Sequence, residues 1–248
     1  MAGQRRSAVR TAVVWDALHA ALDTRADAMA RSLEVVDLGG GTGGLAVRVA
    51  ELGHPVTVVD PSPDALASLE RRSAESGVHD RVRGVLGDAA GLRDILGDSN
   101  VDVVLCHGVL EVLDDPSQAL AAVHTVLRPG GLLSLLAVQR YAAVFARALA
   151  GHLADARLLL DDPDGHWGSG DPVLRRFTED EVIALLTGAA FTPQTIHGVR
   201  TFTDLVPSAL VDSEPDAITD LLELERSVAG RPEFRAVATQ LHVVAVRD

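Results

Sequence analysis

The stretch from Leu33 to Asp60 constrains the fold of this chain more than any other. It opens with the apolar run 33–38, which contains two valines and suits a strand buried on both faces. Five glycines follow within 39–44, where the lack of Cβ atoms lets the backbone approach a ligand closely. A helical stretch and a second apolar run come next, and the second run ends at Asp60. Because ligands of open α/β sheets lie beyond the carboxyl ends of the strands, the glycines and Asp60 are expected to line a nucleoside pocket.

Two interpretations of the glycine loop are open. Gly39-x-Gly41-x-x-Gly44 satisfies the dinucleotide fingerprint, and Asp60 then lies at a suitable distance to bind a ribose. The other interpretation starts at Asp37 and reads D-x-G-x-G-x-G. A carboxylate gains nothing beside a diphosphate, whereas a sulfonium cofactor that carries an amino group tolerates or favours one. The second pattern resembles motif I of class I S-adenosylmethionine-dependent methyltransferases, and an NAD-dependent oxidoreductase is the alternative.

Composition limits the chemistry of the chain. Its 248 residues are 47% hydrophobic with a net charge of −13, enough for one sizeable α/β domain without disulfides. All 22 basic residues are arginines, which excludes lysine Schiff bases and a phosphate-loop lysine. The single cysteine, Cys106, excludes an internal disulfide and a cysteine metal cluster. With no signal peptide and no apolar run of membrane-spanning length, we expect a cytoplasmic protein with no membrane partner and no metal.

Strands and helices are expected to alternate along the first half of the chain. The apolar runs that read as strands are 33–38, 56–59, 82–86, 101–106 and 132–138. Strand–helix units of this length imply a parallel sheet with right-handed crossovers. Two later strands, 191–200 and 241–246, lack a long helix directly before the last one, which indicates an antiparallel edge. The predicted fold is therefore α/β: a doubly wound, mostly parallel, seven-stranded Rossmann-like sheet with an antiparallel edge strand and a helical cap.

We expect a single domain over 1–248, built from consecutive parts. An amphipathic helix at 8–22 forms an N-terminal lid within 1–30, and the cofactor-binding core spans 31–138. A cap insertion at 139–176 consists of a helical stretch, 141–160, and a turn-rich loop. The C-terminal part of the sheet occupies 177–248.

Two polar residues outside the glycine loop have both a functional and a structural interpretation. Arg10, on the lid helix, is able to reach an amino-acid carboxylate, or it is a solvated arginine. Asp88 follows the third strand, where it would accept from an adenine amino group or cap the helix 92–96. Both pairs of interpretations are open at this stage.

With this layout, the chain resembles the class I methyltransferases over roughly 8–138. Gly39–Gly43, Asp60, Asp88 and the turn Leu127–Leu132 stand in that family's order and spacing. A narrower resemblance, to the tRNA 5-carboxymethoxyuridine methyltransferase subfamily, runs to the C-terminus. That enzyme esterifies the carboxylate of a modified wobble uridine. The segments that carry this narrower resemblance are HGVLE at 107–111, GVR at 198–200, LLELE at 221–225 and LHV at 241–243.

The resemblance implies a set of residues that bind S-adenosylmethionine. Arg10 would hold the methionine carboxylate. The loop residues Gly39, Gly40 and Gly41 would face the methionine portion, next to Asp37. Asp60 would take both ribose hydroxyls.

The remaining implied roles concern adenine and the acceptor. Asp88, Ala89 and Ala90 would border adenine, and His107 would lie beside the cofactor. Arg200 would bind a substrate carboxylate with two parallel hydrogen bonds. The alternatives are a structural histidine at 107 and an ion pair between Arg200 and an acid such as Asp204.

The cap departs from the resembling tRNA enzyme, which carries a lysine run and an arginine before the Asp-Pro pair. Here 151–174 holds five acids and one base, Arg157, and Gly170 precedes Asp171. Because phosphate contacts supply much of the affinity for nucleic acids, this segment would repel tRNA unless arginines such as Arg175 and Arg176 compensate.

We therefore expect a methyltransferase that acts on a carboxylate or other oxygen of a small molecule or a modified tRNA uridine. A carboxylate acceptor is already ionised at neutral pH and needs no general base. For a hydroxyl or amine acceptor, His107 is the candidate base, because the ordinary pKa of histidine lies near working pH. A non-catalytic relative that binds the cofactor is the other alternative, and the sequence does not indicate the oligomeric state.

Overall fold

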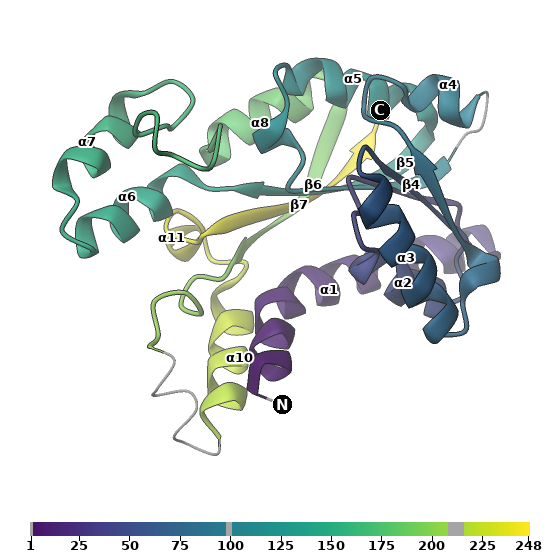
Figure 1. Cartoon of the computed structure of the whole chain (residues 1–248), viewed down its shortest axis with the longest axis horizontal. Helices are drawn as coiled ribbons and strands as arrows, with labels where there is room; N and C mark the ends of the chain where they lie inside the picture. Colours follow the sequence, from purple (N-terminus) through teal and green to yellow (C-terminus); the bar gives the residue numbers. More distant parts are fainter. Residues whose placement is uncertain (1, 98–100, 208–215) are drawn as a thin grey trace. The chain divides into compact units, whose positions relative to one another are not determined.

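The computed structural model describes residues 2–97, 101–207 and 216–248. Seven strands form one sheet in the order β3-β2-β1-β4-β5-β7-β6 (Figure 1). The strands are β1 Val35–Leu38, β2 Val56–Asp60, β3 Val82–Leu86, β4 Val101–His107, β5 Leu127–Val138, β6 Phe191–Val199 and β7 Gln240–Arg247. The predicted number of strands is confirmed.

Helices connect the strands, and two of them differ from expectation. The helices are α1 Ala2–Met29, α2 Gly44–Glu51, α3 Pro63–Glu75, α4 Leu92–Leu96, α5 Pro116–Val126, α6 Arg140–Leu149, α7 Leu153–Asp161, α8 Glu179–Gly188, α10 Ala217–Val228 and α11 Pro232–Arg235. The stretch 141–160, predicted as one helix, is broken at Gly151, whose φ of 83° is left-handed and ends α6. The lid helix α1 extends beyond 8–22 at both ends.

The parallel half of the sheet brings three strand ends together. β1 pairs in parallel with β2 and with β4, so that Leu38 lies opposite both Val59 and Cys106. All four residues of β1 are buried, as the valine-rich run predicted. The carboxyl ends of β1, β2 and β4 therefore meet at one edge of the sheet, where the glycine loop starts.

β7 runs antiparallel to β5. At one end the Gln139 amide donates to the Thr239 carbonyl (3.0 Å), and at the other the Arg247 guanidinium donates to the Leu127 carbonyl. β7 lies between β5 and the edge strand β6. The prediction of a mostly parallel sheet with an antiparallel strand at this edge is confirmed, with β7 one place in from the edge.

The start of β5 corrects one prediction. The segment 127–131 was expected to be a turn before a strand at 132–138, but β5 already begins at Leu127. Gly130 has a φ of 71°, so the turn residues form a bend inside the strand. A Cβ at Gly131 would lie 2.8 Å from the Arg128 carbonyl oxygen and 3.2 Å from that of Asp102. The neighbouring backbone thus requires glycine at this bend.

The chain divides into two compact units. The first unit comprises 1–20, 136–183 and 195–243, and the second comprises 21–135, 184–194 and 244–248. In the first unit α6 and α7 pack against each other as a hairpin (Figure 1), and Val13 and Val14 of α1 pack with Val199 and Ala229. The second unit holds the glycine loop and β1 to β4. The boundaries predicted for lid, core and cap stay a prediction.

A buried carboxylate, Asp102, anchors the start of β4 in the second unit. Its fully buried side chain receives two hydrogen bonds from Arg31, each 2.9 Å long. The Glu34 amide donates to it at 2.8 Å, and Nε of Arg128 lies 2.8 Å away. One carboxylate thereby joins the segment before β1, the start of β4 and the start of β5.

Replacing this acid tests its structural role. Asp102→Asn removes the charge that two guanidinium groups share, and we expect the free energy of unfolding to fall by about 2–4 kcal/mol. Urea denaturation measures the change. Asp80→Asn is the matched control, because that side chain is 88% exposed, and its effect is expected to stay within about 0.5 kcal/mol. A loss below about 1 kcal/mol for Asp102→Asn would contradict the anchoring role.

Candidate functional site

The glycine loop leads from β1 into α2 through alternating left-handed residues. Gly39, Gly41 and Gly43 have φ values of 68°, 54° and 74°. Side chains rarely adopt these angles. The Gly39 amide donates to the Val59 carbonyl at 2.7 Å, and a Cβ at Gly39 would lie 2.7 Å from Cγ2 of Val109. The backbone of the loop therefore stays bare.

Gly40 is required for a different reason, since an added Cβ there would overlap the carboxyl group of Asp37. Cγ1 of Val58 would lie 3.0 Å from the same Cβ. From the sequence, the glycines are expected to allow close approach of a ligand and positive φ angles. At Gly40 the structure adds a packing requirement, because this residue lies directly on the acid that ends β1.

Asp37 is a buried carboxyl with an unmatched oxygen. Asp37 is 3% exposed, and its Oδ2 has no hydrogen-bond partner among the residues that the structure describes. Burial, reinforced by the charge of Asp60, raises the pKa of Asp37 to about 7. A buried acceptor of this kind suits a cationic or hydrogen-donating ligand and disfavours a diphosphate.

Asp60 fixes the other side of the loop. Its Oδ2 accepts from the Gly41 amide and its Oδ1 from the Ser62 amide, both at 2.9 Å. These two bonds set the plane of the carboxylate, and each oxygen keeps a further lone pair. The arrangement allows a bidentate contact with vicinal hydroxyls, and the ribose role of Asp60 stays a prediction.

The turn after β3 carries the residues predicted to border adenine. The Asp88 carboxylate accepts from the Gly91 amide at 3.0 Å, in the turn before α4, but Gly91 is the N-cap of α4 and no side chain caps that helix. Asp88, Ala89 and Ala90 also line a cavity of about 190 Å³. The structure therefore brings these three predicted residues to one cavity.

The same cavity has walls that the sequence did not indicate. Its other lining residues are Leu113, Asp114, Asp115, Gln118 and Ala119. Asp115 caps α5 by accepting from the Ser117 and Gln118 amides at 2.9 and 3.0 Å. The sequence signal for this wall is the run Asp114-Asp115-Pro116, a pattern typical of a helix start.

His107 ends β4 with a ring whose chemistry differs from expectation. Its Nε2 lies 2.8 Å from Oγ of Ser134 on β5. Burial lowers the pKa of His107 to about 4, so the ring is neutral at pH 7. The sequence argument took the ordinary histidine pKa, near working pH, as the basis for a general base. That premise was wrong, because desolvation opposes the charged imidazolium.

The two predicted carboxylate-binding arginines belong to the first unit and meet at one acid. Nη2 of Arg10 lies 3.2 Å from Oδ1 of Asp204, and Nη2 of Arg200 lies 2.5 Å from Oδ2 of the same residue. The structural alternative for Arg200, an ion pair with Asp204, is therefore observed. The other predicted residues belong to the second unit, where the loop, Asp37 and Asp60 form one connected group.

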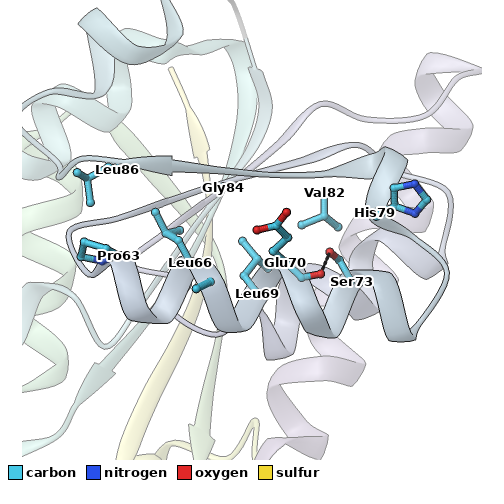
Figure 2. A pocket seen from close by; sticks show the side chains of 10 residues that line it. Pro63, Leu66, Leu69, Glu70, Ser73, His79, Val82, Gly84 and Leu86 are labelled. Carbon is cyan, nitrogen blue, oxygen red and sulfur yellow. Dashed lines mark hydrogen bonds between the residues drawn. The ribbon is translucent and has the colours of Figure 1, made fainter.

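A larger cavity of about 600 Å³ lies between α3 and the edge strand β3. Figure 2 shows Leu66, Leu69 and Glu70 projecting from the helix toward the strand. No residue predicted from the sequence lines this cavity. Its lining residues are Pro63, Leu66, Ala67, Leu69, Glu70, Ser73, His79, Val82, Gly84 and Leu86.

Two searches of the described part of the chain gave negative results. No group of three or more His, Cys, Asp or Glu side chains there is placed to hold a metal ion. Among the same residues, no helix combines the length and the apolar character needed to cross a membrane.

Comparison with known proteins identifies related sequences. A family described as "Methyltransferase domain" matches residues 36–135. The tRNA 5-carboxymethoxyuridine methyltransferase of Escherichia coli (strain K12) is 28% identical over 245 residues, which cover 98% of this chain and 90% of that protein. A ubiquinone biosynthesis O-methyltransferase from Xanthomonas euvesicatoria pv. vesicatoria is 34% identical over 158 residues, covering 58% of this chain and 64% of its own.

A solved structure shares the fold. The crystal structure of a SAM-dependent methyltransferase from Methanosarcina mazei superimposes with a TM-score of 0.59 at 20% identity. The match covers 87% of this chain and 92% of that chain. The Rossmann-like fold predicted from the sequence is thereby confirmed.

The raised pKa of Asp37 predicts a pH-dependent stability. Between its ordinary pKa of 3.8 and the folded value of about 7, the folded protein binds more protons than the unfolded one. The contribution of Asp37 to the free energy of unfolding therefore falls as pH rises through this window and is constant above it. Asp37→Asn removes the titrating group. The free energy of unfolding of the variant should therefore increase relative to that of the wild type as pH rises, by up to roughly 4 kcal/mol at pH 8.

Urea denaturation of both proteins at a series of pH values measures this difference. Asp80→Asn, at an exposed position, serves as the control that should follow the wild type. A difference between Asp37→Asn and the wild type that stays constant from about pH 4.5 to 8 would show that Asp37 ionises normally in the folded protein.

Proposed function

Because this chain is a class I S-adenosylmethionine-dependent methyltransferase, we propose that it methylates a carboxylate oxygen of its acceptor and forms a methyl ester. The observation that carries this proposal is the hydrogen bond between Nε2 of His107 and Ser134, beside a pKa that burial lowers to about 4, which makes the ring a weak base. A carboxylate acceptor is the one common oxygen nucleophile that needs no base at neutral pH.

The second unit fits the cofactor. The unmatched Oδ2 of Asp37 would face positive charge or an amino group, and the bare backbone at Gly39 to Gly41 leaves room for the methionine portion. Asp60 would hold the ribose hydroxyls through a carboxylate that two amides already orient. Asp88, with the two alanines after it, would border adenine in the cavity that they line.

The chemistry of the step asks little of the protein. The bound cofactor supplies a methyl group on a positively charged sulfur, which keeps the bonding electron pair when the acceptor oxygen takes the methyl carbon. No proton is transferred, so the chain's residues need only align the acceptor and exclude water. A hydroxyl or amine acceptor would require a base, and a histidine with a pKa of about 4 is a weak one at pH 7.

Arginine is the only permanent cation that this chain has for binding a carboxylate, because its 22 basic residues include no lysine. Arg200 lies on a turn with its side chain 25% exposed. A guanidinium there offers two parallel N–H donors to an acid. We therefore assign the acceptor carboxylate to Arg200.

The two arginines that could offset the acids of the cap, Arg175 and Arg176, are engaged in ion pairs within it. Asp164 pairs with Arg175 at 2.7 Å, and Asp171 pairs with Arg176 at 2.6 Å in a buried ion pair. The segment 140–176 as a whole holds five arginines and five acids. The proposed ester formation applies to two kinds of acceptor. One is a small acid, and the other is a carboxylate-bearing tRNA uridine of the kind named for the Escherichia coli relative.

Methyl transfer from the radiolabelled cofactor tests the proposal. The purified protein is incubated separately with bulk tRNA and with an extract of small acidic metabolites. We expect label that mild alkali releases as methanol, because methyl esters hydrolyse under conditions that leave methyl ethers and methylamines intact. Label that survives alkali in both samples would contradict ester formation, and the labelled sample identifies the size class of the acceptor.

Replacing His107 separates alignment from base catalysis. We expect His107→Ala to lower the single-turnover rate by about tenfold and to change cofactor affinity less, since loss of a true general base costs roughly 100- to 10,000-fold. Isothermal titration with S-adenosylhomocysteine gives the affinity. Ser134→Ala is the control that removes the bonding partner of the ring and keeps the imidazole. A rate that rises with pH between about 6 and 8 in the wild type and in Asp37→Asn, but not in His107→Ala, would restore the base role.

A further inference from the structure

Asp204 is a shared counter-ion for two arginines that come from distant parts of the chain. Arg10 on α1 is separated from it by 194 residues, yet the two side chains meet at 3.2 Å. Arg200 approaches the other carboxylate oxygen at 2.5 Å, and the hydroxyl of Thr239 lies within donating distance of that oxygen, at 3.2 Å, and of the Arg200 carbonyl, at 3.0 Å. The cluster is open to solvent, with 55% of the Arg10 side chain and 23% of the Asp204 side chain exposed.

Glu225 fixes the turn that carries Arg200 and Asp204 through hydrogen bonds to the backbone of that turn. This residue is 1% exposed. Its carboxylate accepts from three consecutive amides, those of Thr201, Phe202 and Thr203, at 3.0, 3.0 and 2.7 Å. Arg200 itself has a left-handed φ of 61°, which is uncommon for a residue with a side chain. The turn is therefore fixed before any ligand arrives.

The net charge of this cluster favours an anionic ligand. Two guanidinium groups and one carboxylate leave a net charge of +1, so the cluster attracts an anion. Asp204, however, already occupies donors of Arg200 that an acceptor carboxylate would use. An incoming carboxylate must displace it, while Arg10 and Thr239 remain as partners for the displaced acid.

We propose that Asp204 is an internal competitor that an acceptor carboxylate displaces from Arg200 and that returns when the acceptor becomes a neutral ester. This inference rests on the proposed ester-forming function. A methyl ester carries no charge and does not compete with Asp204 for the guanidinium. Asp204 is thus a positioning residue that distinguishes substrate from product and favours release of the product.

Chemical modification of Arg200 tests the displacement directly. Phenylglyoxal modifies accessible, unpaired arginines, and mass spectrometry of peptides from the full-length protein gives the rate at Arg200. We expect Asp204→Asn to raise this rate by roughly three- to tenfold, the range for removing a partly exposed ion pair. Asp16→Asn is the matched control, because it removes a comparable ion pair, with Arg226 at 2.7 Å, in the same unit.

Protection by two small probes reports the competition. Phenoxyacetate supplies a carboxylate on a ring ether, and its methyl ester is the matched neutral compound. In Asp204→Asn the concentration of phenoxyacetate that halves the modification of Arg200 should fall by roughly three- to tenfold, and the methyl ester should protect neither protein. Damage to the structure would weaken protection, so a gain in protection cannot come from misfolding.

Several outcomes overturn the proposal. An unchanged rate at Arg200 in Asp204→Asn, or a need for more phenoxyacetate, assigns Asp204 a purely structural role. Failure of phenoxyacetate to protect either protein shows that the cluster does not bind carboxylates. The radiolabel assay separates this failure from that of the proposed function, because alkali-stable label removes ester formation and leaves the displacement measured at Arg200 intact.

Discussion

The contact between Gly40 and the carboxyl of Asp37 determines the conformation of the glycine loop, where we propose that the cofactor binds. No side chain fits at position 40, because its first atom would overlap the acid. The loop must therefore stay bare, and the Gly41 amide can reach Asp60. Two acids thus lie at one loop in a chain that has no lysine, an arrangement that disfavours a diphosphate and suits a cationic nucleoside. The electrostatics of the loop therefore agree with the enzyme class, as the fold does.

The elements that could be predicted from the sequence are those fixed by local patterns. The buried run of β1 and the glycines after it needed only residue type and spacing. One error arose where a distant contact decides the boundary. β5 begins at Leu127, whose carbonyl accepts from Arg247 at the far end of the chain. No window of local sequence contains that bond.

Candidate site residues were easier to place in the fold than their protonation states. The residue types at the ends of β1, β2 and β4 marked the candidates, because parallel strands place their carboxyl ends together. The lowered pKa of His107 depends on burial and the raised pKa of Asp37 on burial and a neighbouring charge, and neither is visible before the sheet is assembled. The pairing of Arg10 with Asp204 also joins residues that are remote in sequence.

For the proposed reaction, charge distinguishes the acid substrate from its methyl ester product better than shape does. Methylation adds one carbon to the acceptor, and a pocket distinguishes a single methylene by only about 1–3 kcal/mol. The same step removes a full negative charge and with it the charge-assisted bonds to Arg200. An acid already bonded to that arginine, such as Asp204, converts the loss of charge into competition for the same donors. The substrate can then bind firmly without a matching penalty on release of its ester.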